Sequence, residues 1–237
     1  MKVLGLDTST FTGGAGLVDE GQLVAEYVLG IEANHSERLL PAVEHVLSGA
    51  GWSGEQLDAV AVTSGPGSFT GLRIGVATAK VLAYAWDKPL VGVSTLEAMA
   101  WQQSGLGGLV VPIINARRNR VYAAVYRVSA GGNLRPQIIR PAANLPMTEL
   151  LSALNAWDEQ ITFVGDAVNL FSIEISSTIG GRWLRIPAAN AALRAGSVAA
   201  LGEQMLLAGE QANPFTLIPS YLRKAEAEVK WETAHRS

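Results

Sequence analysis

The strongest chemical signal in this sequence is the glycine-rich segment at residues 64–75, which reads SGPGSFTGLRIG. It follows an apolar run at 58–63 that predicts a buried strand, and it leads into an apolar helix expected over 71–86. A turn from a strand into a helix N-terminus can present free backbone N–H groups to an anion. Because glycine has no Cβ, the same turn also lets two backbone segments approach closely. The segment is therefore either a ligand site or a close-contact surface.

Other catalytic motifs do not fit the sequence. Ser68 follows Gly67, whereas a Gly-x-Ser-x-Gly nucleophile elbow needs a glycine two residues before its serine. No Gly-Lys-Ser/Thr sequence is present to close a phosphate-binding P-loop. The only histidines are His35, His45 and His235, which leaves few candidates for a Ser-His-Asp triad. We therefore predict no catalytic residue.

The composition narrows the class of protein. The chain has 237 residues, of which 49% are hydrophobic, enough for one large domain or two of ordinary size. Its net charge of −3 does not indicate a protein that grips nucleic acid alone. It has no cysteine, which excludes disulfides, thiolate catalysis and cysteine-bound zinc, and which fits a reducing cytosol. We expect a cytoplasmic protein without a signal peptide or a membrane span.

The two halves of the chain repeat one order of predicted elements. Each half predicts three hairpin-linked strands followed by alternating helices and strands. The first half has strands at 3–6, 15–18, 23–29, 58–63 and 90–93, with helices at 36–50, at 71–86 and from the N-cap Ser94. The second has strands at 110–114, 121–128, 134–139, 161–164 and 183–186, with helices at 148–157, 168–178 and 190–207. This repetition predicts a duplicated α/β architecture with its junction near 104–108.

These elements define two expected lobes. The N-terminal lobe covers 1–104 and is completed by the C-terminal helix region at about 190–224, and the C-terminal lobe covers 105–189. The charged segment 225–237 is expected to be a flexible tail. Pro41 lies early in the helix at 36–50, so that helix is expected to start late or to bend there.

Several segments together resemble the TsaB (YeaZ) family. They are DTST at 7–10, the block at 65–75, PLVGVSTLEA at 89–98, NARR at 115–118 and PSYLR at 219–223. The resemblance is dense over residues 3–120 and looser beyond. It implies the duplicated fold of the actin, sugar kinase and Hsp70 (ASKHA) superfamily, with two lobes that each have a mixed sheet and flanking helices.

The resemblance also implies a role in tRNA modification. Family members are non-catalytic partners of the related enzyme TsaD and, with the ATPase TsaE, support N6-threonylcarbamoyladenosine (t6A) formation at A37 of ANN-decoding tRNAs. This implies a heterodimer with TsaD, a homodimer when the chain is alone, and contact with tRNA through the complex. We expect no cofactor bound tightly by this chain alone, and ATP or ADP only in the complex with TsaD and TsaE.

The histidine spacing argues against a metal site. TsaD-like enzymes hold a metal with two helical histidines four residues apart, which places both on one helix face. Here His35 begins the corresponding helix, but position 39 is Leu39 and the next histidine is His45. Ten residues advance a helix by about 15 Å, so one straight helix cannot bring both to one metal.

The nucleotide-binding turns of the superfamily are altered as well. Asp7, Thr8 and Ser9 form the first turn, with Ser9 where nucleotide-binding relatives favour glycine, and a Cβ hinders close approach to a phosphate. Asn115 stands where the second turn is expected to be acidic, and residues 163–166 offer one glycine instead of two. We therefore predict that Asp7, Thr8 and Ser9 are a vestigial phosphate turn, and we favour a hairpin or cap role for Asp7.

The helix at 71–86 carries the partner prediction. Small residues recur every four positions (Gly71, Gly75, Ala79 and Ala83), and a helix that is apolar nearly all round is buried on more than one side. A small-residue ridge lets another helix approach closely, although it can equally pack inside the subunit. The resemblance implies pairing through this helix and the one at 36–50. The predicted interface residues are Leu39, Leu40, Val43, Val46, Leu47, Ser68, Phe69, Thr70, Arg73, Ile74, Ala77, Thr78 and Val81.

Arginines add two weaker signals. A cation in a first helical turn opposes the helix dipole, so we hypothesise that Arg73 pairs with a partner carboxylate or a bound phosphate, the alternative being a solvated side chain. Arg117, Arg118 and Arg120 predict a basic turn that faces tRNA or the partner.

Two other functions stay open. One is an ATP-dependent enzyme of the same fold, a small-molecule kinase or acyltransferase, against which Asn115 argues because it cannot supply a magnesium-bridging carboxylate. The other is a metallopeptidase-like protein, against which the unpaired histidines argue.

Overall fold

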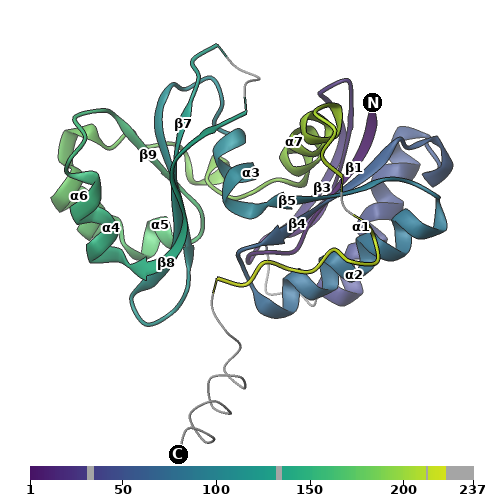
Figure 1. Cartoon of the computed structure of the whole chain (residues 1–237), viewed down its shortest axis with the longest axis horizontal. Coiled ribbons are helices and arrows are strands. Elements are labelled where there is room, and N and C mark those ends of the chain that lie inside the picture. The colour runs from purple at the N-terminus through teal and green to yellow at the C-terminus, as the bar shows by residue number, and fades with distance from the viewer. Residues whose placement is uncertain (31–34, 132–134, 212, 223–237) are drawn as a thin grey trace, which may run out of the picture.

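The structure, a computed structural model, describes residues 1–30, 35–131, 135–211 and 213–222, arranged around two sheets (Figure 1). The first sheet has the order β3-β2-β1-β4-β5 and the second the order β8-β7-β6-β9. Strands of the first are β1 (Lys2–Asp7), β2 (Gly13–Asp19), β3 (Gln22–Leu29), β4 (Ala59–Gly65) and β5 (Leu90–Ser94). Strands of the second are β6 (Gly108–Asn115), β7 (Arg120–Val128), β8 (Gln137–Pro146) and β9 (Ile161–Val164). Each sheet begins with an antiparallel three-stranded meander, as the repeated pattern predicted, to which the first sheet adds the parallel strands β4 and β5 and the second adds β9.

Helices cover both faces of the first sheet (Figure 1). The helices α1 (His35–Ala50) and α2 (Phe69–Ala85) lie on one face, and α3 (Thr95–Trp101) and α7 (Ala195–Leu207) lie on the other. Side chains of a strand alternate between faces, so Leu4 and Val62 pack with α1 and α2, whereas Val3 and Ala61 pack with α3 and α7. Pro41 lies inside α1, so the expected late start of this helix is wrong.

The second sheet is covered by α4 (Met147–Leu154), α5 (Ala167–Leu170) and α6 (Ser172–Ile179) on one face only. Its other face joins the core that contains α3 and α7, and residues 95–100 of α3 are all buried between the sheets. Arg135, which precedes β8, also forms ion pairs with Glu97 of α3 and with Glu210 after α7. The two sheets therefore share one continuous core. The predicted lobe boundaries themselves stay predictions.

Four elements differ clearly from the sequence prediction. The strand at 183–186 is wrong, because this segment makes only an isolated bridge between Trp183 and Ile161. The helix at 168–178 is split into α5 and α6 at Phe171, and the helix at 190–207 begins only at Ala195. The strand at 134–139 starts at Gln137, continues to Pro146, and tolerates Pro141 because β8 is an edge strand that needs no outward N–H.

Some predictions concern residues outside the described part of the chain. The flexible tail at 225–237 and His235 lie outside it, as do residue 134 and the side chain of His35. Among the described helices, none combines the length and the apolar character that crossing a bilayer requires.

Candidate functional site

The glycine-rich segment is a close-contact surface in this structure. The Ser68 N–H donates to the Ser9 carbonyl at 2.7 Å, and the Thr8 hydroxyl donates to the Gly71 carbonyl at 2.7 Å. A Cβ at Gly71 would lie 1.9 Å from the Thr8 carbonyl oxygen, and a Cβ at Gly67 would lie 2.2 Å from that of Ser9. Glycine is therefore required at both positions for the start of α2 to cover the turn after β1.

Asp7 joins the ends of two strands. It is buried, and its Oδ1 accepts hydrogen bonds from the Ser9 N–H at 2.9 Å, the Ser9 hydroxyl at 2.6 Å and the Thr63 hydroxyl at 2.8 Å. Thr8 and Ser9 are buried with it. A carboxylate that accepts three local donors fixes the end of β1 against β4, which is the structural role we favoured for it.

A cleft of about 470 Å³ lies beside this turn. Its walls come from residues 10–12, from the β9–α6 region and from the segment 183–193, and they include Phe11, Asp166, Trp183 and Arg185. Asp7, Thr8 and Ser9 do not line it. Within the described ranges, no three His, Cys, Asp or Glu side chains gather as metal ligands would.

Asp166 is the acidic residue of the cleft wall. Its Oδ1 accepts the Asn115 N–H at 2.9 Å, which ties the β9–α5 turn to the end of β6. The surrounding wall desolvates the carboxyl and raises its pKa, and the backbone N–H groups of Asn115 and Ala167 partly oppose this shift. Asp166 therefore favours its neutral form more than an ordinary aspartate does.

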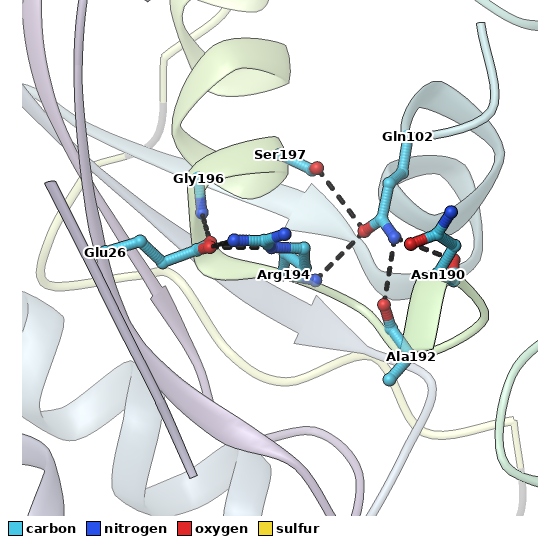
Figure 2. Close-up of polar contacts among 7 residues, drawn as sticks. All are labelled: Glu26, Gln102, Asn190, Ala192, Arg194, Gly196 and Ser197. Carbon is cyan, nitrogen blue, oxygen red and sulfur yellow. Dashed lines mark hydrogen bonds and ion pairs between the residues drawn. The ribbon is translucent and has the colours of Figure 1, made fainter. Parts of the chain in front are cut away.

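The segment at 190–196, which crosses between the lobes and leads into α7, is held by side chains of the first lobe (Figure 2). Gln102 Nε2 donates to the carbonyls of Asn190 and Ala192 at 3.0 and 2.9 Å, while its Oε1 accepts the Arg194 N–H at 3.0 Å. Glu26 pairs with the Arg194 guanidinium and accepts the Gly196 N–H at 2.8 Å. These contacts fix one wall of the cleft, because residues 188 and 191–193 line it.

The predicted partner residues separate into three groups. Leu40, Ser68, Phe69, Thr70, Arg73, Ala77 and Val81 are exposed, and Leu47, Ile74 and Thr78 are half-buried. Leu39, Val43 and Val46 are buried against the first sheet, so their placement on a partner surface is wrong. They are the face of α1 that the chain itself covers.

The small-residue ridge of α2 also serves the chain itself. Gly71, Gly75, Ala79 and Ala83 are all buried, and a Cβ at Gly75 would lie 2.4 Å from the Thr8 hydroxyl oxygen. The prediction that this ridge receives a partner helix is therefore wrong, and the intramolecular alternative is correct. The partner-facing candidates lie on a different face of α2, where Val81 is 66% exposed.

Sequence reasoning missed two contributors to that face. Tyr84 of α2 is 72% exposed and packs against Phe215 at 5.9 Å between ring centroids. Tyr221 stacks on Phe69 at 4.8 Å and accepts a hydrogen bond from Arg73 Nε at 3.1 Å. For Tyr221 the only sequence signal was the PSYLR segment, which carried the family resemblance without an assigned position. Tyr84 was one of the apolar residues around the helix at 71–86, without an assigned partner.

The basic turn is a strained hairpin tip. Arg117, Arg118 and Asn119 all have left-handed backbone angles, with φ of 63°, 53° and 56°. Asn115 Oδ1 accepts the Arg117 N–H at 2.8 Å, and Arg120 Nε donates to Asn144 Oδ1 at 2.8 Å. The structure therefore holds two exposed arginines at a fixed turn.

Fold and site together define a class, the two-lobed α/β proteins with the actin-like fold. At the level of fold alone, the chain superposes on component A of the (R)-2-hydroxyglutaryl-CoA dehydratase of Acidaminococcus fermentans with a TM-score of 0.53, at 11% identity over 87% of this chain and 99% of the other. YeaZ from Pseudomonas aeruginosa is much more similar, with a TM-score of 0.74 and 27% identity over 93% of this chain and 99% of the other.

Sequence comparison gives the family. Residues 25–231 match the model of TsaD, the tRNA N6-adenosine threonylcarbamoyltransferase. The Bacillus subtilis tRNA threonylcarbamoyladenosine biosynthesis protein TsaB is 37% identical over 98% of each chain. The chain belongs to the TsaB family of tRNA threonylcarbamoyladenosine biosynthesis proteins.

Proposed function

We propose that this chain is a non-catalytic partner of TsaD and that, with TsaE, it supports t6A formation at A37 of ANN-decoding tRNAs. The observation that carries the proposal is the outward face of α2, where Phe69, Ala77, Val81 and Tyr84 are exposed. Contiguous apolar side chains on a surface helix are typical of a protein–protein contact. A partner helix laid on α2 would bury them.

The geometry around Asp7 supports the non-catalytic part of the proposal. Its Oδ1 already accepts three hydrogen bonds, and the start of α2 covers the turn in which a nucleotide phosphate would need close backbone approach. Asn115 uses its side chain to hold the Arg117 N–H instead of supplying a second carboxylate. We propose that ATP or ADP binds in the complex with TsaD and TsaE and not tightly to this chain alone.

The α2 face also accounts for the proposed assemblies. The chain forms a homodimer when alone, and TsaD replaces the second copy on the same face. The tRNA is reached through the complex, in the cytoplasm. Because TsaD matches this chain at the level of the family model, both partners offer related surfaces.

Arg73 has a proposed place in this contact. Its guanidinium carbon lies 3.9 Å from the Phe69 ring centroid, and it has no carboxylate within 4 Å among the described residues. We expect Arg73→Ala to weaken TsaD binding at least tenfold, since a hydrogen bond to a charged group contributes about 1.5–3 kcal/mol. Arg127→Ala, which removes an exposed arginine of the C-terminal lobe, should leave the affinity unchanged. Equal affinities for the two variants would remove Arg73 from the interface.

The proposed function is tested by reconstitution. A reaction with TsaD, TsaE, ATP, the threonylcarbamoyl donor and an ANN-decoding tRNA is run with wild-type chain, with Val81→Glu and with Ile173→Glu. Ile173 is 81% exposed on α6, so it is a matched control in the other lobe. Wild type and Ile173→Glu should support t6A formation, and Val81→Glu should lower it at least tenfold. If the chain alone turned over ATP, and if t6A formation did not require the chain, the result would favour an enzyme that acts through the cleft.

A further inference from the structure

Residues 213–222, named here the C-terminal strap, run alongside α2 (Figure 1, yellow). A turn opens the strap: Asn213 Oδ1 accepts the Phe215 N–H at 2.8 Å, and the Asn213 carbonyl accepts the Leu217 N–H at 3.0 Å. At its other end the Ser220 N–H donates to the Ser64 carbonyl at 2.6 Å, next to the end of β4. The strap is therefore tied to the first sheet at one end and to itself at the other.

The first sheet is shaped to receive the strap. Leu217 packs against the core beneath α1 and α2, and a Cβ at Gly92 would lie 2.8 Å from its Cδ1. A Cβ at Gly65 would lie 2.4 Å from the Ser220 carbonyl oxygen, at a backbone φ of +123° that favours glycine. Gly65 therefore leaves space for the strap, whereas Gly67 and Gly71 leave space for the turn after β1.

The outward side of the strap continues the exposed face of α2. Phe215 and Ile218 are each 75% exposed, and Tyr221 is partly exposed. Tyr221 stacks on Phe69 and Phe215 contacts Tyr84, so the aromatic pairs join the strap to both ends of the helix. Six large side chains from the two elements form one composite surface: Phe69, Val81, Tyr84, Phe215, Ile218 and Tyr221.

The two cations of this composite surface are positioned by the strap. Arg73 Nε donates to the Tyr221 hydroxyl at 3.1 Å, and Lys80 Nζ donates to the Phe215 carbonyl at 3.5 Å. Over the part of the chain that the structure covers, no carboxylate lies within 4 Å of either one. Fixed cations amid apolar side chains are complementary to a partner that places carboxylates between apolar residues.

We propose that TsaD binds α2 and the C-terminal strap together, so that the strap supplies half of the docking surface. This inference rests on the proposed function, and it commits to a partner whose contacting helix carries carboxylates flanked by apolar side chains. A second copy fits less well, because a two-fold axis through the middle of α2 brings Arg73 and Lys80 opposite the same cations of the other copy. The strap therefore favours TsaD over self-association.

The test uses the most exposed side chains of the strap, which can be changed without disturbing the core. The double variant Phe215→Ser/Ile218→Ser is compared with Leu170→Ser/Ile173→Ser, whose targets are 59% and 81% exposed in the other lobe. Titration calorimetry of each full-length chain with TsaD measures the dissociation constant. We expect the dissociation constant to be at least tenfold larger for the strap variant and to change less than twofold for the control. Val81→Glu, on α2, serves as the reference for loss of the helix contact.

Each outcome separates the strap from the proposed function. If wild type binds TsaD and Val81→Glu does not, but the strap variant binds like wild type, the strap inference is overturned and the proposed function stands. If wild type does not bind TsaD, the proposed function fails and the strap inference fails with it. If the strap variant loses homodimer affinity but keeps its affinity for TsaD, the occupant is a second copy and the inference is wrong.

Discussion

Arg73 and Tyr221, which are 148 positions apart in the sequence, are joined by a hydrogen bond of 3.1 Å from the guanidinium Nε to the phenol oxygen. Because α2 begins at Phe69, Arg73 lies in its second turn, so the expected first-turn position is wrong, and Tyr221 lies near the end of the C-terminal strap. The Phe69 ring contacts both side chains. The ring below and the phenol oxygen beside it orient the Arg73 guanidinium on the exposed face of α2.

Removing the Tyr221 ring should loosen the strap. Tyr221→Ala loses the aromatic pair with Phe69 and is expected to lower the free energy of unfolding by about 1 kcal/mol. Tyr221→Phe keeps the ring and loses only a partly exposed hydrogen bond, so we expect a change of about 0.5 kcal/mol or less. Urea unfolding measures both variants, and hydrogen exchange at the Ser220 amide should accelerate in Tyr221→Ala alone. Equal exchange in both variants and wild type would show that the ring does not hold the strap.

A single methyl group at Gly71 should destabilise the whole N-terminal lobe. The added Cβ would lie 1.9 Å from the Thr8 carbonyl oxygen, so either α2 or the turn after β1 must move. Overpacking of this kind costs about 3 kcal/mol. Gly49→Ala in α1 is the control, since a Cβ there meets nothing within 4 Å and alanine favours a helix by up to about 1 kcal/mol. Urea midpoints that move equally for the two variants would contradict the tight contact.

Gln102 should contribute more to the stability of the folded protein than the size of its side chain suggests. Gln102→Ala leaves the carbonyls of Asn190 and Ala192 and the N–H of Arg194 without this partner, and we expect a loss of about 2 kcal/mol. Gln204→Ala, at an exposed position of α7, should change the free energy of unfolding by less than about 0.5 kcal/mol. Thermal unfolding ranks the two, and exchange at the Arg194 amide reports the crossing segment directly. An unchanged Arg194 amide in Gln102→Ala would rule out this anchor.

Tyr126, in the core shared by the two sheets, should make the free energy of unfolding depend on pH above pH 10. Burial raises its pKa to about 12, the nearby Glu97 adds to the shift, and a hydrogen bond with Ser94 and the charge of Arg135 oppose it. Because the folded-state pKa is above the unfolded value of about 10, the stabilisation is complete below pH 10 and is lost as pH rises toward 12. For this group alone, about 1 kcal/mol should disappear between pH 10 and 11.

The comparison with Tyr126→Phe isolates that effect from other groups that titrate at high pH. The difference in free energy of unfolding between wild type and Tyr126→Phe should shrink or reverse in favour of phenylalanine by about 1 kcal/mol from pH 10 to 11. A difference that stays constant over this interval would mean that the Tyr126 phenol titrates normally in the folded protein.

The regular elements could be predicted because their periodicity reflects burial. The apolar run at 58–63 and the helix at 71–86 correspond closely to β4 and α2, and the repeated order of elements corresponds to the two mixed sheets. The segment at 183–186 is apolar enough for a strand, but only Trp183 pairs with Ile161. Nothing local distinguishes such a segment from a strand, since the missing hydrogen bonds depend on a neighbouring strand far along the chain.

The candidate site was less accessible to sequence reasoning. A helix that is apolar all round shows that several faces are used, but it does not show which face the chain itself covers. Gly71 and Gly75 of the small-residue ridge face Thr8, whereas Val81 and Tyr84 face outward. The strap has no periodicity, and its position depends on Gly65 and Gly92 leaving space for it. The position of the strap thus depends on three segments that are far apart in the sequence, namely the strap itself and the surroundings of Gly65 and Gly92.

The central claim is tested most directly by light scattering on the purified chain, alone and mixed with TsaD from the same organism, without and with ATP. We expect a 1:1 complex with TsaD that replaces the homodimer, and we expect Val81→Glu to abolish it while Ile173→Glu does not. Absence of a complex under every condition, together with ATP turnover by this chain alone, would contradict the account and direct attention to the cleft.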